Sequence, residues 1–135
     1  MIEYRMIGGG ILASALWKGA RFRTRSGDSD YRADLTRVTQ AIKAIEQALS
    51  ESKSERDGLG RRVSDALSGA AMLVGNGTDE YIEREITNAA CLREYEAEIA
   101  SGQRRLDHLH YVIAQFEFLK AEIMARFSRV LSQER

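Results

Sequence analysis

The chain has 135 residues, of which 44% are apolar and 30% charged, and its 20 basic and 20 acidic residues cancel to a net charge of zero. This length fits a single domain, and the balanced charge gives no electrostatic indication of nucleic-acid binding by the chain as a whole. Proline is absent and Cys91 is the single cysteine, so long helices are favoured and an internal disulfide framework is excluded. A lone cysteine is typical of a reducing compartment, and we expect a cytoplasmic protein.

Residues 1–28 form a basic, glycine-containing N-terminal segment, whose first 25 residues carry a net charge of +4. Its apolar stretch, residues 6–17, is shorter than the ~20 residues that a membrane span needs. Three glycines dilute the stretch and basic residues come after it, which disfavours a signal peptide.

Aromatic and cationic side chains alternate at the end of this segment. Such a mixture can contact an anionic membrane surface or nucleic-acid phosphates. The equally weighted alternative is a short helix that packs on the rest of the protein with its basic side in water. The candidate contact residues are Trp17, Lys18, Arg21, Phe22, Arg23 and Arg25.

A first long helix is predicted over residues 29–74, with Asp28, Ser29 and Asp30 as candidate caps. Apolar residues recur along it in alternating steps of four and three, the spacing of a coiled-coil seam. Because a composition of 44% apolar would fill about half of these positions, the repeat indicates a buried face. The positions are Tyr31, Leu35, Val38, Ile42, Ile45, Leu49, Ser52, Arg56, Leu59, Val63, Ala66, Ala70 and Leu73.

A loop is expected at residues 75–78, since Gly75 is a helix stop and Thr78 is a good N-cap for a second helix. This second long helix is predicted over residues 79–133. Its own seam consists of Leu92, Tyr95, Ile99, Gly102, Leu106, Leu109, Ile113, Phe116, Lys120, Ile123, Phe127 and Val130.

The two seams match when the chain folds back on itself. Pairing Ile45 with Leu109 and Val38 with Phe116 gives residue numbers that sum to 154, and half of this sum falls inside the predicted loop. We therefore expect an all-α fold: a long antiparallel two-helix coiled-coil hairpin with a short N-terminal helical or irregular segment. The alternative is a three-helix bundle with a break near Gly58–Gly60, because two glycines cost ~2 kcal/mol of helix propensity.

The middle of the hairpin is poor in apolar side chains. In the expected register Ser52 meets Gly102 and Arg56 meets Ile99. This layer is either a hinge or a weak layer in which Arg56 extends its charged end to water.

The second helix has an apolar face too broad for one neighbouring helix. Its last apolar residues are expected to project past the start of the first helix, so either the N-terminal segment or a second copy of the chain must cover them. We expect a homodimer. The predicted partner-binding residues are Phe116, Phe118, Leu119, Phe127, Val130 and Leu131.

No catalytic or metal-binding pattern stands out. His108 and His110 are two residues apart, which directs them to different faces of a helix, whereas metal pairs need a spacing of three or four. Cys91 is far from both histidines along the expected hairpin. We therefore expect no enzyme activity, no cofactor and no metal.

In shape the expected hairpin resembles small coiled-coil accessory proteins of bacterial secretion and flagellar export machines and of phages. The resemblance implies a non-enzymatic interaction protein, such as a scaffold, adaptor or chaperone-like assembly component, with a protein partner. The alternative is a peripheral membrane or nucleic-acid tether that uses the basic N-terminal segment.

Overall fold

The computed structural model describes residues 26–75 and 82–133, and the described chain is helical without a strand. Helix α2 spans Gly27–Gly75, α3 spans Ile82–Arg126 and the short α4 spans Ser128–Leu131. The chain divides into two units, Met1–Asp34 and Leu35–Arg135, with the boundary inside α2. The first unit therefore contributes only the beginning of α2 to the described structure.

The start of α2 is capped by Ser26. Its carbonyl oxygen accepts hydrogen bonds from the backbone N–H groups of Ser29 and Asp30, and its hydroxyl oxygen lies 3.4 Å from the Ser29 nitrogen. The predicted caps at Asp28, Ser29 and Asp30 are therefore wrong by two to four residues. Asp28 and Asp30 instead lie in the first turn, where a carboxylate interacts favourably with the helix dipole.

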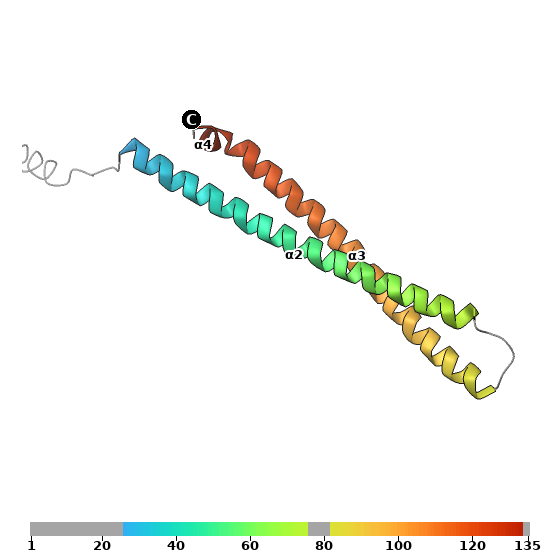
Figure 1. Ribbon diagram of the computed structural model, residues 1–135. Helices are drawn as coiled ribbons and strands as arrows, with labels where there is room; N and C mark the ends of the chain where they lie inside the picture. The colour runs from blue at the N-terminus through green and yellow to red at the C-terminus, as the bar shows by residue number, and fades with distance from the viewer. Residues whose placement is uncertain (1–25, 76–81, 134–135) are drawn as a thin grey trace, which may run out of the picture. The chain divides into compact units, whose positions relative to one another are not determined.

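Helix α2 runs without interruption through Gly58 and Gly60 (Figure 1). This excludes the three-helix bundle. The helix is maintained because Leu59 and Val63 continue the apolar repeat across the glycines, and most of the stability of a helix in a protein comes from packing rather than propensity.

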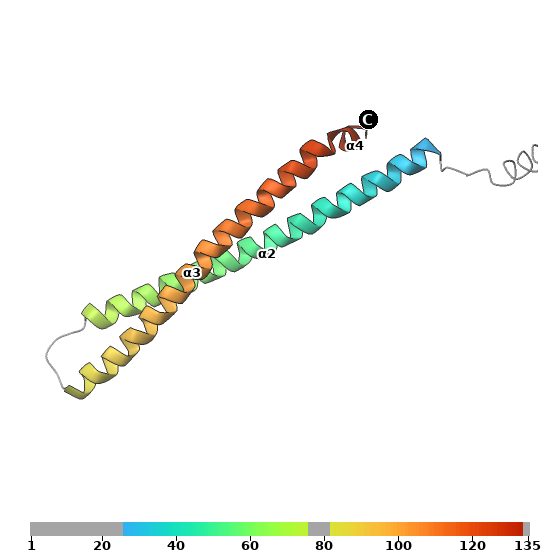
Figure 2. The same ribbon diagram turned by 180° about the vertical axis from the view of Figure 1, so that it is seen from behind.

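Within the second unit α2 and α3 pack side by side as an antiparallel hairpin, and both views show them crossing (Figures 1 and 2). The second helix is not continuous to residue 133 as predicted. It ends at Arg126, where Phe127 leaves helical geometry with φ −102° and ψ 21°. Val130 then donates its N–H to the Phe127 carbonyl oxygen, so α4 starts with a tighter turn.

The faces predicted to be buried are the faces that pack. From Leu35 onward every position of the first seam is buried or half-buried, as is every position of the second seam from Leu92 except Phe127. We call these positions the inner seam. Its buried apolar side chains, among the described residues, are Val38, Leu49, Val63, Ala66, Leu109 and Ile113.

The expected register is wrong. A Cβ atom placed on Gly102 would overlap the Val63 side chain, and one on Gly69 would lie 2.7 Å from the Tyr95 ring. These pairs have residue numbers that sum to 165 and 164 rather than 154 or 155. Gly102 therefore faces Val63 instead of Ser52.

The error has a physical reason. In a seam of alternating three- and four-residue steps, a slip of ten or eleven residues again places apolar residues opposite apolar residues. The observed register differs because it sets large side chains against glycines: Val63 on Gly102 and Tyr95 on Gly69. In the expected register Gly102 faces Ser52, and two small residues leave a gap that close packing does not tolerate.

Candidate interaction surface

Helix α3 carries a second apolar repeat on the side turned away from α2. Its steps are three, four, three and four residues, the spacing that one more helix would need in order to pack here. We call this repeat the outer seam. It consists of Tyr111, Ala114, Phe118, Ala121 and Ala125.

All five outer-seam side chains are exposed, and Tyr111 and Phe118 each keep 61% of their surface in contact with solvent. Each residue turns a helix by about 100°, so Phe118 lies roughly 180° from Leu109, which is only 2% exposed. The same helix therefore buries one apolar stripe against α2 and presents another in the opposite direction.

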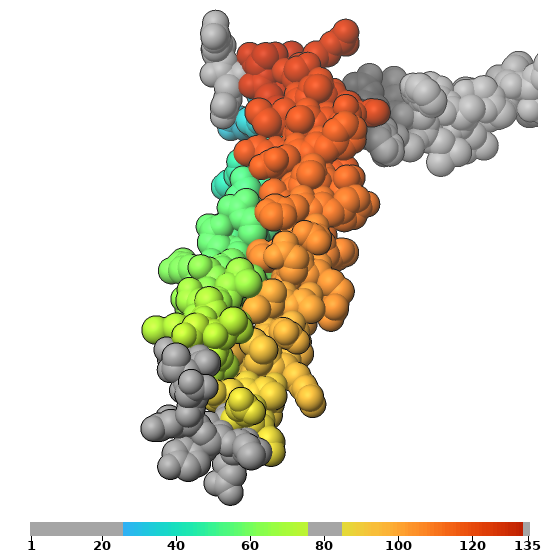
Figure 3. All heavy atoms as spheres, turned by 90° about the vertical axis from the view of Figure 1, so that its right-hand side faces the viewer, coloured from blue at the N-terminus to red at the C-terminus, as the bar shows by residue number. Residues whose placement is uncertain are grey.

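The space-filling view shows α3 as a continuous ridge beside α2 (Figure 3). The outer seam lies on the side of this ridge that faces away from α2, where α2 leaves it exposed to solvent. Leu119 and Met124, which are 46% and 47% exposed, lie about 100–120° around the helix from Phe118, on the two flanks of the inner seam.

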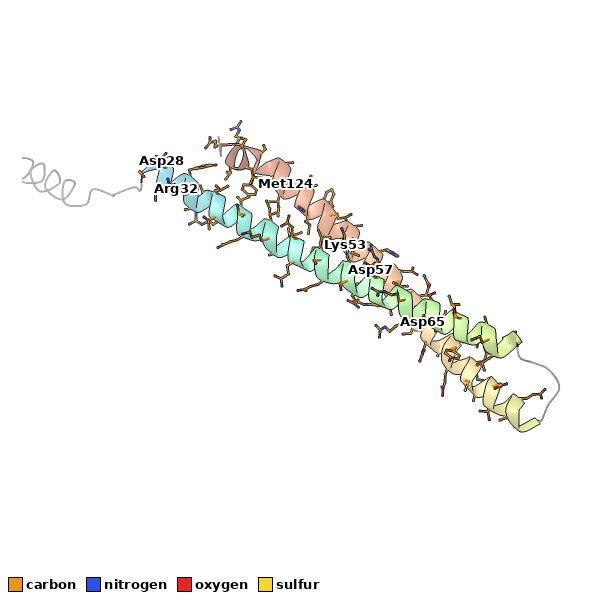
Figure 4. The ribbon with its side chains drawn as sticks, viewed as in Figure 1. Asp28, Arg32, Lys53, Asp57, Asp65 and Met124 are labelled. Carbon is orange, nitrogen blue, oxygen red and sulfur yellow. The ribbon has the colours of Figure 1, made fainter. Side chains whose placement is uncertain are left out.

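Ion pairs cross between the helices along both flanks of the inner seam. On one flank Lys53 contacts Glu117 at 2.9 Å and Lys120 contacts Glu46 at 2.8 Å (Figure 4 labels Lys53). On the other flank Arg105 forms a bidentate ion pair with Glu55, with N–O distances of 2.8 and 3.0 Å.

The Glu55–Arg105 pair is geometrically the most specific of these contacts. Hydrogen bonding by the guanidinium lowers the pKa of Glu55 below its ordinary value, and the carboxylate in turn raises the pKa of Arg105. Both side chains remain accessible to water, so the pair contributes more to specifying the register than to total stability.

The predicted partner-binding residues divide into four groups. Phe118 and Leu119 are exposed on α3, whereas Phe116 is half-buried in the inner seam. Phe127, between α3 and α4, is 44% exposed. Val130 and Leu131 are half-buried in α4.

The expected projection of the last apolar residues past the first helix is corrected by the register. A sum of 165 places Phe127 in the layer of Val38 and Val130 in the layer of Leu35. The burial of Val38 agrees with this cover. In this register the end of α3 lies level with residues 35–38 of α2 and does not project past the start of that helix, although Phe127 itself remains 44% exposed.

The sequence indicated one broad face on the second helix, and the structure resolves it into two seams. Ala114, Ala121 and Ala125 were missed as members of the outer seam because alanine carries little apolar weight by itself. A search for a second series of alternating three- and four-residue steps would have found them.

The described residues hold no cluster of three or more His, Cys, Asp or Glu side chains placed for a metal ion. His108 and His110 are exposed on different sides of α3, and the His108 ring lies 6.3 Å from that of Tyr111. Cys91 is half-buried and unpaired by a disulfide.

Two grooves run along the flanks of the inner seam and are open to solvent. The groove beside Lys53 is lined largely by charged residues, whereas the groove beside Arg105 is lined mainly by apolar and small residues; each contains members of the ion pairs between the helices. In the middle layer Arg56 donates from Nε to the Asp57 carboxylate at 2.9 Å, so its charge is directed outward while Gly102 is packed under Val63. The predicted layer of Ser52 with Gly102 and of Arg56 with Ile99 does not exist in the observed register, so neither the hinge nor the weak layer applies to it.

The basic and aromatic residues of the N-terminal segment, from Trp17 to Arg25, lie outside the described residues. The same holds for the predicted loop residues 76–78. Among the described residues no helix combines the length and apolar content that crossing a membrane requires.

Comparisons with family models, with curated proteins and with solved structures give no match for this chain.

Proposed function

We propose that this protein is a non-enzymatic interaction module: a coiled-coil hairpin that holds α3 straight and presents its outer seam to a partner helix. Its role would be that of a scaffold, adaptor or chaperone-like assembly component, for example in a secretion system or a phage, acting in the cytoplasm. The observation that carries the proposal is the exposure of Tyr111 and Phe118 on a helical repeat opposite the inner seam.

The spacing of the outer seam favours a helix as the partner. Residues spaced by three and four form one continuous stripe along a helix. This is also the spacing of the anchor residues through which helices bind one another. It contains two aromatic residues and three alanines, so the aromatic side chains project from the helix and the alanines leave recesses between and beyond them. Exposed apolar patches of this kind mark interaction sites.

Several features support a role without catalysis. In the described part of the chain most charged residues lie on solvated faces of the helices, and several form ion pairs, whereas Arg56, Tyr95 and Lys120 lie in the inner seam. The grooves beside them are open rather than enclosed, whereas small-molecule sites bury most of their ligand.

Site-specific photo-crosslinking tests the proposal. A photoreactive phenylalanine replaces Phe118 in one variant and Leu67, a 53% exposed residue of α2, in a matched control. In cells that naturally express the chain, we expect a discrete adduct from position 118 and none of comparable yield from position 67. Equal labelling at both positions, or none at either, contradicts the proposed surface.

The alternative, a membrane or nucleic-acid tether, is supported by the net charge of +4 in the first 25 residues. Its test is deletion of residues 1–25. If the segment is a tether, the deletion abolishes binding to anionic liposomes or to DNA and leaves the helical hairpin stable.

A further inference from the structure

We propose that the partner of the outer seam is a second copy of the same chain, with the two α3 helices packed antiparallel and Phe118 at the two-fold axis. This inference rests on the proposed function, since it names the helix that the outer seam binds.

The first support is the self-complementarity of the outer seam. Reversing its direction about Phe118 places Tyr111 against Ala125 of the second copy, and Ala114 against Ala121. Every aromatic residue away from the axis thus meets an alanine. A two-fold interface requires this property, because the same patch must fit itself.

The aromatic pair at the axis fits as well. Phe118 meets Phe118 of the second copy, and both side chains are 61% exposed in the single chain. Offset or edge-to-face packing of two such rings is favourable beyond the area that it buries. The alanines on either side let the two helices approach closely enough for that contact.

Charge complementarity is the second support. Asp107 lies one helical step before Tyr111 on α3, and Arg129 follows the other end of the outer seam in α4, beyond the break at Phe127; both are exposed and opposite in charge. The antiparallel arrangement brings Asp107 of one copy toward the end of the other copy that carries Arg129, and the two-fold axis repeats this arrangement. A parallel arrangement would instead place Asp107 beside Asp107.

The flanks near the axis agree with this arrangement. Glu117 comes closest to its own equivalent, but its charge is already balanced by Lys53 at 2.9 Å. On the other flank Glu122 lies near Gln115 of the second copy, whose amide can donate to a carboxylate. The antiparallel interface therefore contains no uncompensated like-charge contact among these residues.

The homodimer expected from the sequence used the ends of the second helix. In the observed register those ends do not project past α2, and Val130 and Leu131 are half-buried. Among the described residues, the outer seam is an exposed apolar repeat that runs over several turns of α3.

Cysteine pairing tests the arrangement in the full-length chain. Cys91 is replaced by serine, and single cysteines are introduced as F118C, A114C or A121C, one of them carrying a mass tag. We expect F118C to form a disulfide-linked dimer by itself upon mild oxidation. A114C and A121C should link poorly alone but efficiently when mixed with each other. These last variants retain Phe118, so their result does not depend on its loss.

Sedimentation of the F118K variant gives an independent readout. Two lysines at the axis should raise the dimer dissociation constant at least tenfold, whereas L67K should leave it unchanged. Circular dichroism confirms that both variants remain helical, as expected for substitutions at exposed positions.

Equal self-linking of all three cysteine variants would indicate parallel pairing and overturn the proposed arrangement. A monomer at high micromolar concentration, with no cysteine linkage, would overturn self-pairing altogether. In that case an adduct at position 118 with a mass other than twice the chain would leave the proposed function standing with a foreign helix as partner. Absence of any adduct at that position would contradict both.

Discussion

The side chain of Val63 packs directly against the backbone of Gly102, so closely that a Cβ atom at that glycine would overlap it. This contact between α2 and α3 identifies the register of the hairpin. It also explains why a glycine lies in the middle of a helix where it costs ~1 kcal/mol relative to alanine.

Replacing Gly102 by alanine should therefore destabilise the protein. Alanine gains helix propensity, but the added methyl group must displace the stiff side chain of Val63, and overpacking of this kind costs ~1–3 kcal/mol. Gly58 supplies the matched control, because nothing lies within 4 Å of a Cβ atom there. Gly58→Ala should stabilise by ~0.5–1 kcal/mol. Urea denaturation measures both changes, and stabilisation by both would show that the register is misplaced.

The deepest point of the inner seam is Leu109, at 2% exposure, while Phe116 is half-buried. Leu109→Ala should cost ~2–5 kcal/mol because it removes buried methyl groups and leaves a cavity. Phe116→Ala should cost less than a fully buried phenylalanine would. Thermal or chemical unfolding ranks the two variants, and a larger loss at Phe116 would contradict the observed core.

The Glu55–Arg105 pair should make a pH-dependent contribution. The pKa of Glu55 in the folded protein is lowered below its ordinary value of 4.5, chiefly by the hydrogen bond from Arg105. Because the pKa of this carboxyl group is lower in the folded protein than in the unfolded chain, ionisation of the group stabilises the fold at a pH above the pKa of the unfolded chain. This stabilisation is lost as the pH falls through the pKa of the folded protein. NMR titration of the Glu55 carboxyl carbon should give a midpoint below 4.5 that moves up in the R105Q variant. The R104Q variant, altered at the neighbouring exposed residue, should leave it in place.

Glu46 and Lys120, 2.8 Å apart, test the register by charge reversal. E46K and K120E should each lower the free energy of unfolding by up to ~1 kcal/mol. The double variant should recover part of this loss, because it restores the ion pair with the charges exchanged. The recovery should shrink at about 1 M salt, where charges are screened beyond ~3 Å. Strictly additive effects at low salt would show that the two side chains do not interact.

The faces of the helices were predictable from the sequence, whereas their alignment was not. Positions such as Leu49, Val63 and Ile113 can be assigned from periodicity, since a side chain's direction depends only on its place in the repeat. The alignment depends on which large side chains pack against which small residues. Gly69 and Gly102 are not apolar residues, so a search for an apolar pattern does not register them.

The outer seam was only partly predictable. Phe118 and Leu119 stood out as aromatic and apolar residues outside the first repeat, and the structure places both at the surface. Tyr111 could be assigned to the exposed face of α3, rather than to its buried face, only once the side on which α2 packs was known. The break at Phe127 had no warning in the sequence, because neither glycine nor proline is near it.

The alternating steps of the inner seam have a consequence for how the chain reaches its fold. A repetitive seam allows several registers of similar packing, and two helices that pair in the wrong register have to separate before they can pair in the right one. Contacts between nearby parts of the sequence, such as Gly69 with Tyr95, cost the least loop entropy and form earliest. In a misaligned hairpin Val63 and Tyr95 would lack the glycines that they pack against, so the aligned hairpin is the more stable one.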